Sequence, residues 1–355
     1  MELIIRADAT NELGIGHVMR SLAIAEEWLE YQIGPVYLFG NIESNQLKRF
    51  LYNKGIKVFS LINGYRDSDK IISLFYKKEV WVVIDGYGFD NEYIRSLKEA
   101  GLNVLFIDDL ALPHISAHIF LNYNFYSQEL VYDTEAYCLI GPSYSLIRKE
   151  FILKRSRKDY FKNRKCYNLM ITVGGGDSAG LIPKIVQALA QITEYKFHVK
   201  IIIGPVASLD VDNLIKFSGQ PHYFSFERAQ FSMASIMAWA DFAITAGGST
   251  CFELAYMKVP FLVCSIADNQ EPTVEWLIKN KFAYPLTGTS QFDIYEMAHA
   301  IKIFMNDNSE KQKNASRLAK LVDGKGKWRV VREMLNFSTK DTHDLIKVKG
   351  FYNSR

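Results

Sequence analysis

Cysteine is scarce in this sequence, and its cysteines stand far apart. The 355 residues contain four, at positions 138, 166, 251 and 264. No two are spaced as in a zinc knuckle or a redox Cys-x-x-Cys pair, and four are too few for a disulfide framework in a chain of this length. We therefore expect reduced thiols in a cytoplasmic protein.

Long apolar runs and an excess of one charge are also missing. No stretch approaches about 18 uninterrupted apolar residues, so we expect no membrane insertion. Arg6 and Asp8 interrupt the first apolar run, which is typical of a strand rather than a signal peptide. Lys and Arg total 42 against 39 Asp and Glu, and this net charge of +3 is too small to indicate a nucleic-acid partner. The sequence leaves the oligomeric state open.

The composition is that of a globular chain with material for two domains. Hydrophobic residues make up 48% and charged residues 23%, which provides a sizeable core and excludes a disordered or low-complexity chain. At about 150 residues per domain, the length predicts two domains.

Short apolar runs alternate with helical patterns in both halves of the chain. Several runs, such as Val80-Trp-Val-Val-Ile84, are typical of strands buried on both faces of a parallel sheet. Strands are predicted at 3–7, 36–40, 57–61, 80–85, 104–108, 119–122 and 137–140, and again at 169–173, 199–203, 223–226, 242–245, 261–265 and 283–286. The clearest helices are predicted at 17–30, 181–193, 250–258, 272–280, 293–305 and 309–336, the last interrupted at 324–326.

A basic segment divides the two halves. Residues 154–165 hold seven Lys or Arg and one Asp, which favours a solvated linker over a phosphate or nucleic-acid contact. We predict a Rossmann-like N-terminal domain over 1–153, a linker over 154–166, a Rossmann-like C-terminal domain over 167–337 and a tail over 338–355. Two doubly wound α/β domains facing each other would place the C-terminal ends of their strands along one cleft, where such folds bind ligands.

Three glycine-containing turns follow predicted strands and precede helices. They lie at 11–17, 174–177 and 247–250. Such turns let the backbone approach a ligand and direct helix N–H groups at anionic oxygens. Neither a Gly-x4-Gly-Lys-[Ser/Thr] P-loop nor a Gly-x-Gly-x-x-Gly dinucleotide motif is present. Plain corner turns are the alternative, but three at equivalent strand ends favour a nucleotide-type ligand with a diphosphate.

The third turn has two interpretations. Thr250-Cys-Phe-Glu253 fits a capping box, in which Thr250 is the N-cap and Glu253 reaches back to it. Alternatively, the hydroxyls and N–H groups of Ser249 and Thr250 bind phosphate, and Glu253 accepts hydrogen bonds from ribose hydroxyls. The sequence alone favours the cap slightly, and the two roles conflict only in part.

His17 is the most informative titratable residue. It follows Gly14-x-Gly16 at the end of the first predicted strand and begins an amphipathic helix. A helix N-terminus favours the neutral imidazole, and a neutral histidine at a cleft can take a proton from water or a hydroxyl. A hydrogen-bond donor at the helix start is the alternative role.

No metal or cofactor is predicted. The Asp108-Asp109 pair lacks a histidine or a third carboxylate at helical spacing, so turn capping is its expected role. A Gly-x-Ser-x-Gly nucleophile elbow is also absent from the sequence.

Taken in order, the motifs resemble one enzyme family. The first half reads Arg6-x-Asp8, Gly14-x-Gly16-His17-x-x-Arg20, Asp85-x-Tyr87, Asp108-Asp109 and Gly141-x-x-Tyr144-x-x-Ile147-Arg148-x-Glu150-Phe151. The second half continues with Gly174-Gly175-x-Asp177, Gly248-Ser249-x-x-x-Glu253, Ala267-x-Asn269-Gln270 and Asp323-Gly324-x-Gly326. Over about residues 1–335 this order resembles the pseudaminic-acid pathway UDP-2,4-diacetamido-2,4,6-trideoxy-β-L-altropyranose hydrolases, relatives of the MurG-like glycosyltransferases.

The resemblance implies a GT-B architecture and metal-independent hydrolysis of a UDP-sugar. Water would attack the anomeric carbon with inversion, with His17 as the base, and UDP would leave. The substrate-binding residues implied are Gly14, Gly16, Arg20, Tyr87, Gly175, Gly248, Ser249, Thr250, Glu253, Asn269 and Gln270. Departures from the family pattern, including Thr250 for Ser and Phe252 for Trp, leave the particular sugar open.

Two other functions stay open. A GT-B glycosyltransferase would use a UDP-sugar donor and a sugar or lipid acceptor in place of water, but no amphipathic membrane segment is evident. A non-catalytic sugar-nucleotide-binding module is less favoured because His17 is present.

Overall fold

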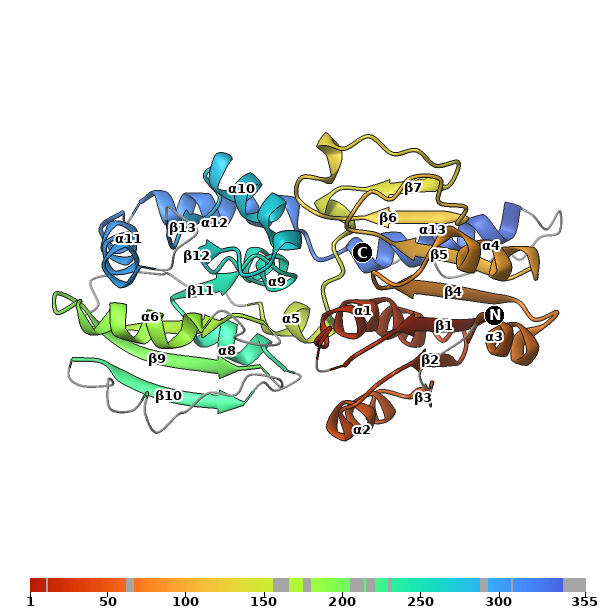
Figure 1. Cartoon of the computed structure of the whole chain (residues 1–355), viewed down its shortest axis with the longest axis horizontal. Coiled ribbons are helices and arrows are strands. Elements are labelled where there is room, and N and C mark those ends of the chain that lie inside the picture. Colours follow the sequence, from red (N-terminus) through yellow and green to blue (C-terminus); the bar gives the residue numbers. More distant parts are fainter. Residues whose placement is uncertain are drawn as a thin grey trace.

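The computed structural model describes residues 1–10, 12–61, 67–155, 166–174, 180–204, 214, 221–228, 232–287, 293–307 and 309–340. Within them, two parallel β-sheets with their own helices lie end to end (Figure 1). Most of the expected linker, the expected site residue Gly175 and most of the expected tail fall outside the described residues.

The first sheet has seven parallel strands in the order β3-β2-β1-β4-β5-β6-β7. Trp81 and Val83 of β4 enter one core, and Val82 and Ile84 enter the core on the opposite face. Because both faces are buried, these strands read as continuous apolar runs in the sequence. The strands are β1 (Glu2–Ala7), β2 (Val36–Gly40), β3 (Ile56–Ser60), β4 (Val80–Asp85), β5 (Asn103–Ile107), β6 (Ile119–Asn122) and β7 (Tyr137–Ile140).

Helices connect these strands over the faces of the sheet. Two of them begin at side-chain caps: Ser44 accepts from the N–H of Leu47, and Asp90 accepts from the N–H of Tyr93. The elements of this half are α1 (Gly16–Glu30), α2 (Asn45–Asn53), α3 (Asp67–Phe75), α4 (Asn91–Glu99), η1 (Ser127–Glu129), η2 (Pro142–Tyr144) and α5 (Lys149–Lys154).

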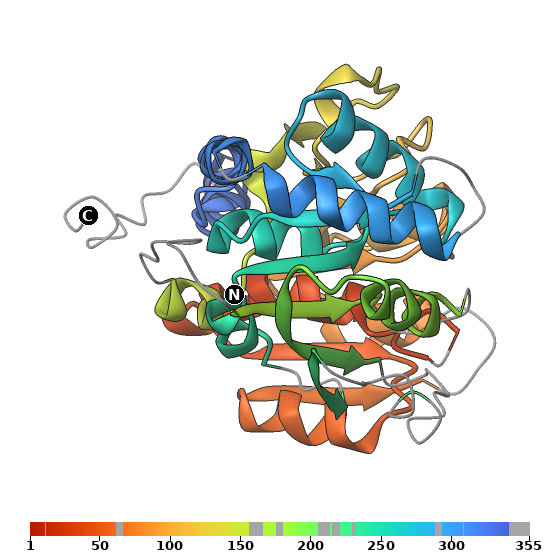
Figure 2. The same cartoon turned by 90° about the vertical axis from the view of Figure 1, so that its left-hand side faces the viewer.

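The second sheet has six parallel strands in the order β10-β9-β8-β11-β12-β13. They are β8 (Cys166–Thr172), β9 (Lys196–Ile203), β10 (Tyr223–Arg228), β11 (Phe242–Ala246), β12 (Phe261–Cys264) and β13 (Tyr284–Pro285). Helices α6 (Leu181–Ala190) and α11 (Ile294–Asn306) share the core on one face of this sheet (Figure 2). The other elements are α8 (Ala234–Trp239), α9 (Thr250–Met257), η3 (Asp268–Gln270), α10 (Glu271–Lys279), α12 (Glu310–Leu321) and α13 (Gly326–Lys340).

The last helix returns to the first domain. Although residues up to 337 were expected to belong to the second domain, α13 packs against α1. Lys327 Nζ lies 3.2 Å from Glu27 Oε2, and Trp81 Nε1 donates to Ser338 Oγ at 2.9 Å. Among the described residues, no helix is long and apolar enough to cross a bilayer.

Each sheet has one point at which its strand order reverses. The chain runs outward from β1 to β3 and then resumes at β4 beside β1, and it does the same from β8 to β10 and β11. A crevice opens beyond the C-terminal ends of the two strands that flank such a point. Those ends carry His17 and Asp85 in the first sheet, and Gly174 after β8 and the turn after β11 in the second. The two reversal points therefore place the predicted base and the predicted diphosphate-binding turns.

Candidate active site

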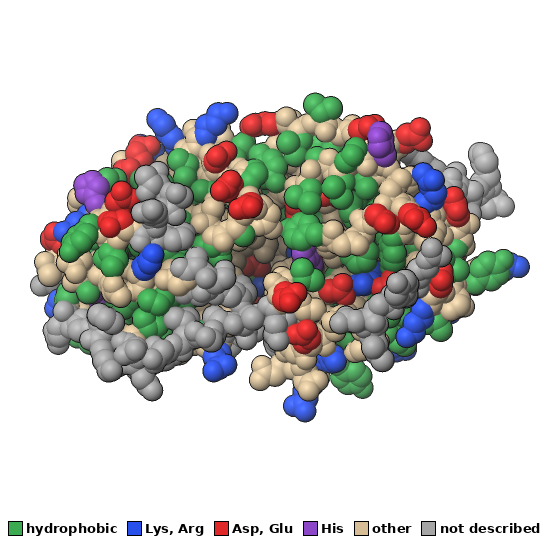
Figure 3. All heavy atoms as spheres, viewed as in Figure 1, with side chains coloured by type: hydrophobic (Ala, Val, Ile, Leu, Met, Phe, Trp, Pro, Cys, Tyr) green, Lys and Arg blue, Asp and Glu red, His purple; other side chains and the backbone are tan. Residues whose placement is uncertain are grey.

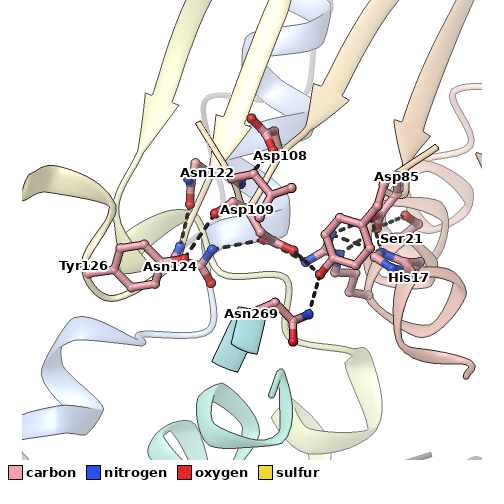
Figure 4. Close-up of polar contacts among 12 residues, drawn as sticks. His17, Ser21, Asp85, Asp108, Asp109, Asn122, Asn124, Tyr126 and Asn269 are labelled. Carbon is pink, nitrogen blue, oxygen red and sulfur yellow. Dashed lines mark hydrogen bonds and ion pairs between the residues drawn. The ribbon is translucent and has the colours of Figure 1, made fainter. Parts of the chain in front are cut away.

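His17 is the second residue of α1 and contacts the end of β4. Its Nδ1 lies 2.8 Å from Oδ1 of Asp85, and both residues are buried (Figure 4). The sequence brings this contact about through helix geometry. His17, Arg20 and Ser21 are spaced three and four residues apart, so they share one face of α1, and all three bind Asp85.

Asp85 is an anion in this environment. Arg20 donates to both of its oxygens, at 2.7 and 2.5 Å, and Ser21 Oγ donates to Oδ2 at 2.9 Å. Burial alone would raise the pKa of Asp85, but the charge of Arg20 and the hydrogen bonds from His17 and Arg20 outweigh it and lower the pKa to about 2. The carboxylate therefore accepts hydrogen bonds at any pH near neutrality.

The charge on Asp85 assigns the tautomer of His17. A carboxylate 2.8 Å from Nδ1 requires a hydrogen on Nδ1, which leaves the lone pair of the neutral ring on Nε2. Arg20 Nη2 also lies 3.3 Å from Nδ1, but it donates to Asp85 Oδ1 at the shorter distance of 2.5 Å, so the contact between Nδ1 and the carboxylate decides the tautomer. Among the described residues, no hydrogen bond reaches Nε2, so the basic nitrogen is available to a ligand.

Arg20 is held between two carboxylates. Its Nη1 donates to Asp109 at 3.0 and 2.8 Å while its other nitrogens bind Asp85. Burial would lower the pKa of Arg20, but Asp109 and Asp85 raise it well above its ordinary value. This residue was expected to bind substrate. In the structure its nitrogens fix the charge and position of the carboxylate behind His17.

The Asp108-Asp109 pair divides into two roles. Asp108 accepts from the backbone N–H groups of Leu110 and Leu112 at 2.7 and 2.6 Å, which is the turn capping that the sequence favoured. Asp109 accepts from Arg20 and from Asn124 Nδ2, the latter at 3.0 Å (Figure 4). The network around Asp109 was missed in the sequence.

Tyr87 lies beside the imidazole and reaches the second domain. Its ring meets His17 edge-on, with ring centroids 4.9 Å apart. The hydroxyl donates to Asp109 at 3.3 Å and accepts from Asn269 Nδ2 of η3 at 3.0 Å. Burial, and then the charge of Asp109, raise the pKa of Tyr87, so the hydroxyl keeps its proton near neutral pH. Two residues expected near the sugar, Tyr87 and Asn269, are thus brought together beside His17.

The turn after β11 presents an uncapped helix N-terminus. Ser249 is the N-cap of α9, and its side chain makes no capping hydrogen bond within the described part of the chain. Among the described residues, no backbone carbonyl accepts from the N–H groups of Ser249 or Thr250. A Cβ added to Gly248 would meet no atom within 4 Å, so space is open beside this backbone. These are the conditions for an anion site at a helix start.

The capping-box interpretation of this turn is wrong. Thr250 is the first residue inside α9 rather than its N-cap. The carboxylate of Glu253 does not reach back to the helix start, because Oε1 accepts from Arg148 Nη2 at 3.0 Å. Arg148 is 105 residues away in the sequence, so local spacing could not predict this competing partner.

A pocket lies where α1 and α9 approach each other. It measures about 310 Å³, including solvent space at its mouth, and the surface is hollowed between the two domains (Figure 3). Three expected site residues share it, Arg20 from the first domain and Ser249 and Glu253 from the second. Residues not predicted complete its wall: Met19, Tyr123, Leu146, Ile147 and Phe252.

Aromatic rings join the two domains beside this pocket. Phe252 of α9 stacks on Phe125 at 4.1 Å, and Phe125 stacks in turn on Trp276 of α10 at 5.6 Å. Trp276 Nε1 also donates to Glu129 Oε1 at 2.8 Å. Phe252, which stands where the resembled family has tryptophan, therefore keeps an aromatic ring that packs across the domain boundary.

The remaining expected residues have supporting positions. Gly14 and Gly174 have positive φ angles of 72° and 86°, which glycine adopts most readily. Gly16 begins α1 with open space at its Cα. Gln270 Oε1 accepts from the backbone N–H of Ile266 at 3.2 Å, so this end of its side chain orders the loop before η3.

Comparison with known proteins connects this geometry to one class of fold. Residues 168–322 match the glycosyltransferase family 28 C-terminal domain. The crystal structure of Acinetobacter baumannii MurG superposes with a TM-score of 0.64 at 15% identity, over 94% of this chain and 99% of that protein. The chain has a GT-B fold. The predicted pair of Rossmann-like sheets is thereby confirmed.

Relatives by sequence confirm the resemblance that the motifs indicated for this GT-B protein. The UDP-2,4-diacetamido-2,4,6-trideoxy-β-L-altropyranose hydrolase of Campylobacter jejuni is 25% identical over 291 residues, covering 79% of this chain and 98% of that protein. An uncharacterized protein of Methanocaldococcus jannaschii is 24% identical over 276 residues, covering 74% of this chain. The chain spans about half the length of that second relative, 55%.

Proposed function

We propose that this chain hydrolyses a UDP-sugar to UDP and the free sugar, a proposal supported by the name of its Campylobacter relative, which is that of a UDP-sugar hydrolase. The observation that carries the proposal is the His17–Asp85 pair, whose basic Nε2 is unclaimed among the described residues at the reversal point of the first sheet. The uncapped start of α9 lies at the equivalent point of the second sheet and supplies the complementary anion site.

The UDP end of the substrate is assigned to the second domain. The N–H groups and hydroxyls of Ser249 and Thr250, with the positive end of the α9 dipole, would stabilise charge developing on the leaving diphosphate. Glu253 would accept hydrogen bonds from the ribose hydroxyls. Gly248 and Gly175 would allow close backbone approach.

The sugar end is assigned to the first domain. His17 Nε2 removes a proton from water as its oxygen bonds to the anomeric carbon, and the bond from that carbon to the diphosphate oxygen breaks with both electrons leaving on UDP. The imidazolium that forms is stabilised by the anionic Asp85. Because water attacks opposite the leaving group, the configuration at the anomeric carbon inverts.

The finer assignment is the substrate UDP-2,4-diacetamido-2,4,6-trideoxy-β-L-altropyranose, which would place the reaction in pseudaminic acid biosynthesis. It is supported by the name of the Campylobacter relative and the order of the motifs. Tyr87 and Asn269, joined by a hydrogen bond beside the imidazole, would contact this sugar. The proposed reaction draws on no metal ion.

The alternative is transfer of the sugar to an acceptor other than water, which the family 28 domain match favours. Incubation with the UDP-sugar and no acceptor separates the two. Steady UDP release and appearance of the inverted free sugar by NMR support hydrolysis. Release that requires an added acceptor supports transfer, and UDP release that is unchanged in His17→Ala contradicts the assignment of the base.

A further inference from the structure

The segment after η2 joins the helix of His17 to the helix of Glu253. Arg148 is the N-cap residue of α5, and the backbone N–H of the next residue, Lys149, donates to Glu26 Oε2 of α1 at 2.7 Å. The preceding residue, Ile147, lines the pocket between α1 and α9. The backbone position of Arg148 is therefore fixed by the first domain, at the edge of the pocket.

The guanidinium of Arg148 is fixed from three sides. Its Nη1 lies 2.7 Å from Glu150 Oε1, its Nη2 donates to Glu253 Oε1 at 3.0 Å, and its charge lies 5.0 Å from the ring centre of Phe151. Glu150 is itself bound to the second domain. It accepts from Ser232 Oγ and from the backbone N–H of Met233, the N-cap residue of α8. A buried arginine with this many constraints has one orientation.

Glu253 has one oxygen committed to Arg148 and one that is not. Among the described residues, no hydrogen bond reaches Oε2, and the carboxylate lines the pocket between the domains. Burial raises the pKa of Glu253, and the charge and hydrogen bond of Arg148 oppose that rise. Without Arg148, this carboxyl group would take up a proton more readily and would be free to rotate.

We propose that Arg148 is a positioning residue that keeps the carboxylate of Glu253 ionised and aimed into the pocket to receive the ribose diol of the nucleotide. This inference rests on the proposed function and adds a residue that acts through Glu253 without touching substrate. It also accounts for the Ile147-Arg148-x-Glu150-Phe151 motif, whose members otherwise have no part in the chemistry.

The test measures how well the protein distinguishes UDP from 2′-deoxy-UDP. A carboxylate that receives the 2′-hydroxyl favours UDP by about tenfold or more, because a hydrogen bond to a charged group contributes on that scale. The dissociation constants of both nucleotides are measured by calorimetry for wild type, Arg148→Gln, Arg148→Lys and Glu253→Gln. Arg155→Gln is the matched control, because Arg155 follows α5 and contacts the Tyr256 ring of α9.

We expect the preference for UDP to fall toward 1 in Arg148→Gln and Glu253→Gln, to be partly kept in Arg148→Lys, and to be unchanged in Arg155→Gln. If Arg148→Gln keeps the wild-type preference, or weakens both nucleotides equally, Arg148 does not position Glu253. If Arg148→Gln does not fold, the charge-preserving Arg148→Lys decides through the same preference for UDP over 2′-deoxy-UDP. Full wild-type preference in Arg148→Lys would show that the guanidinium group is not needed to position Glu253.

Failure of the proposed function would look different. A wild type that releases UDP from a UDP-sugar but does not distinguish UDP from its deoxy form overturns the role of Arg148 and Glu253 and leaves the hydrolysis standing. A wild type that binds no UDP overturns both proposals.

Discussion

Asp85 Oδ1 lies 2.8 Å from His17 Nδ1, although 68 residues separate them in the sequence. The contact exists because β4 pairs with β1, so the end of β4 lies directly under the start of α1. A buried carboxylate here determines which ring nitrogen carries the hydrogen, and hence where the base is.

Asp85→Asn should lower kcat by about 100-fold or more while changing KM little. The amide can donate its NH₂ to Nδ1, which moves the ring hydrogen to Nε2 and removes the lone pair that accepts the proton. UDP release under saturating UDP-sugar measures the effect. Ser21→Ala is the control, because the Ser21 hydroxyl binds Oδ2 of this carboxylate and not Oδ1, the oxygen that contacts His17 Nδ1, and it should lose less than about tenfold. Full activity in Asp85→Asn would remove the carboxylate from the mechanism.

Asp85 should also give the fold a characteristic acid sensitivity. Its pKa is about 2 in the folded protein against 3.8 for the ordinary carboxyl, so its stabilising contribution is complete above pH 4 and is lost as pH falls through 2. The contribution is about 2 kcal/mol. Urea unfolding at several pH values between 2.5 and 5 should show a steeper loss in wild type than in Asp85→Asn. Equal slopes would mean that the carboxylate has an ordinary pKa in the folded state.

Much of the fold could be predicted from the sequence because parallel strands covered on both faces must be apolar throughout. Val80–Asp85 illustrates this, since every residue of the strand is buried. The glycine turns were equally visible, because close backbone approach and positive φ select glycine at Gly14 and Gly174. The strand bounds observed agree with those predicted to within a few residues.

The site could be predicted only in part, because its contacts depend on strand order. Arg20 binds Asp85 and Asp109, which lie at the ends of β4 and β5. The local sequence does not show that these two strands come next to β1 in the order of the sheet. Acidic residues ending two neighbouring predicted strands were the available signal. The capping-box interpretation of Glu253 failed for the same reason, since its partner Arg148 lies 105 residues away and the contact depends on the tertiary fold.

Phe252→Ala should weaken the contact between the domains. Phe252 is buried, stacks on Phe125 and meets Tyr123 edge-on at 5.2 Å, so its loss leaves a cavity at the pocket wall. The free energy of unfolding should fall by about 3 kcal/mol, and KM for the UDP-sugar should rise. Thermal unfolding and initial rates measure the two effects. Phe252→Trp introduces the ring that the resembled hydrolase family carries here, and it should retain the wild-type stability and KM. An alanine variant with unchanged stability and KM would show that this aromatic stack does not stabilise the contact between the domains.

Lys311 should make the protein more stable as the pH rises above 8. Its ammonium is buried and donates to the carbonyls of Phe304 and Met305, at 3.1 and 3.0 Å, at the end of α11. Burial lowers the pKa of Lys311 from 10.5 to about 8. Between these values the folded protein has released this proton and the unfolded chain still holds it, so the free energy of unfolding rises with pH by about 3 kcal/mol.

The measurement is denaturant unfolding between pH 7.5 and 10.5 on wild type, Lys311→Met and Lys313→Met. Lys313 lies on the same helix but is exposed and paired with Glu310, so its replacement should leave the pH slope unchanged. Lys311→Met should lack the gain because it has no proton to release. If wild type and Lys311→Met change in parallel across this range, Lys311 titrates as an ordinary lysine and its buried ammonium does not limit stability at neutral pH.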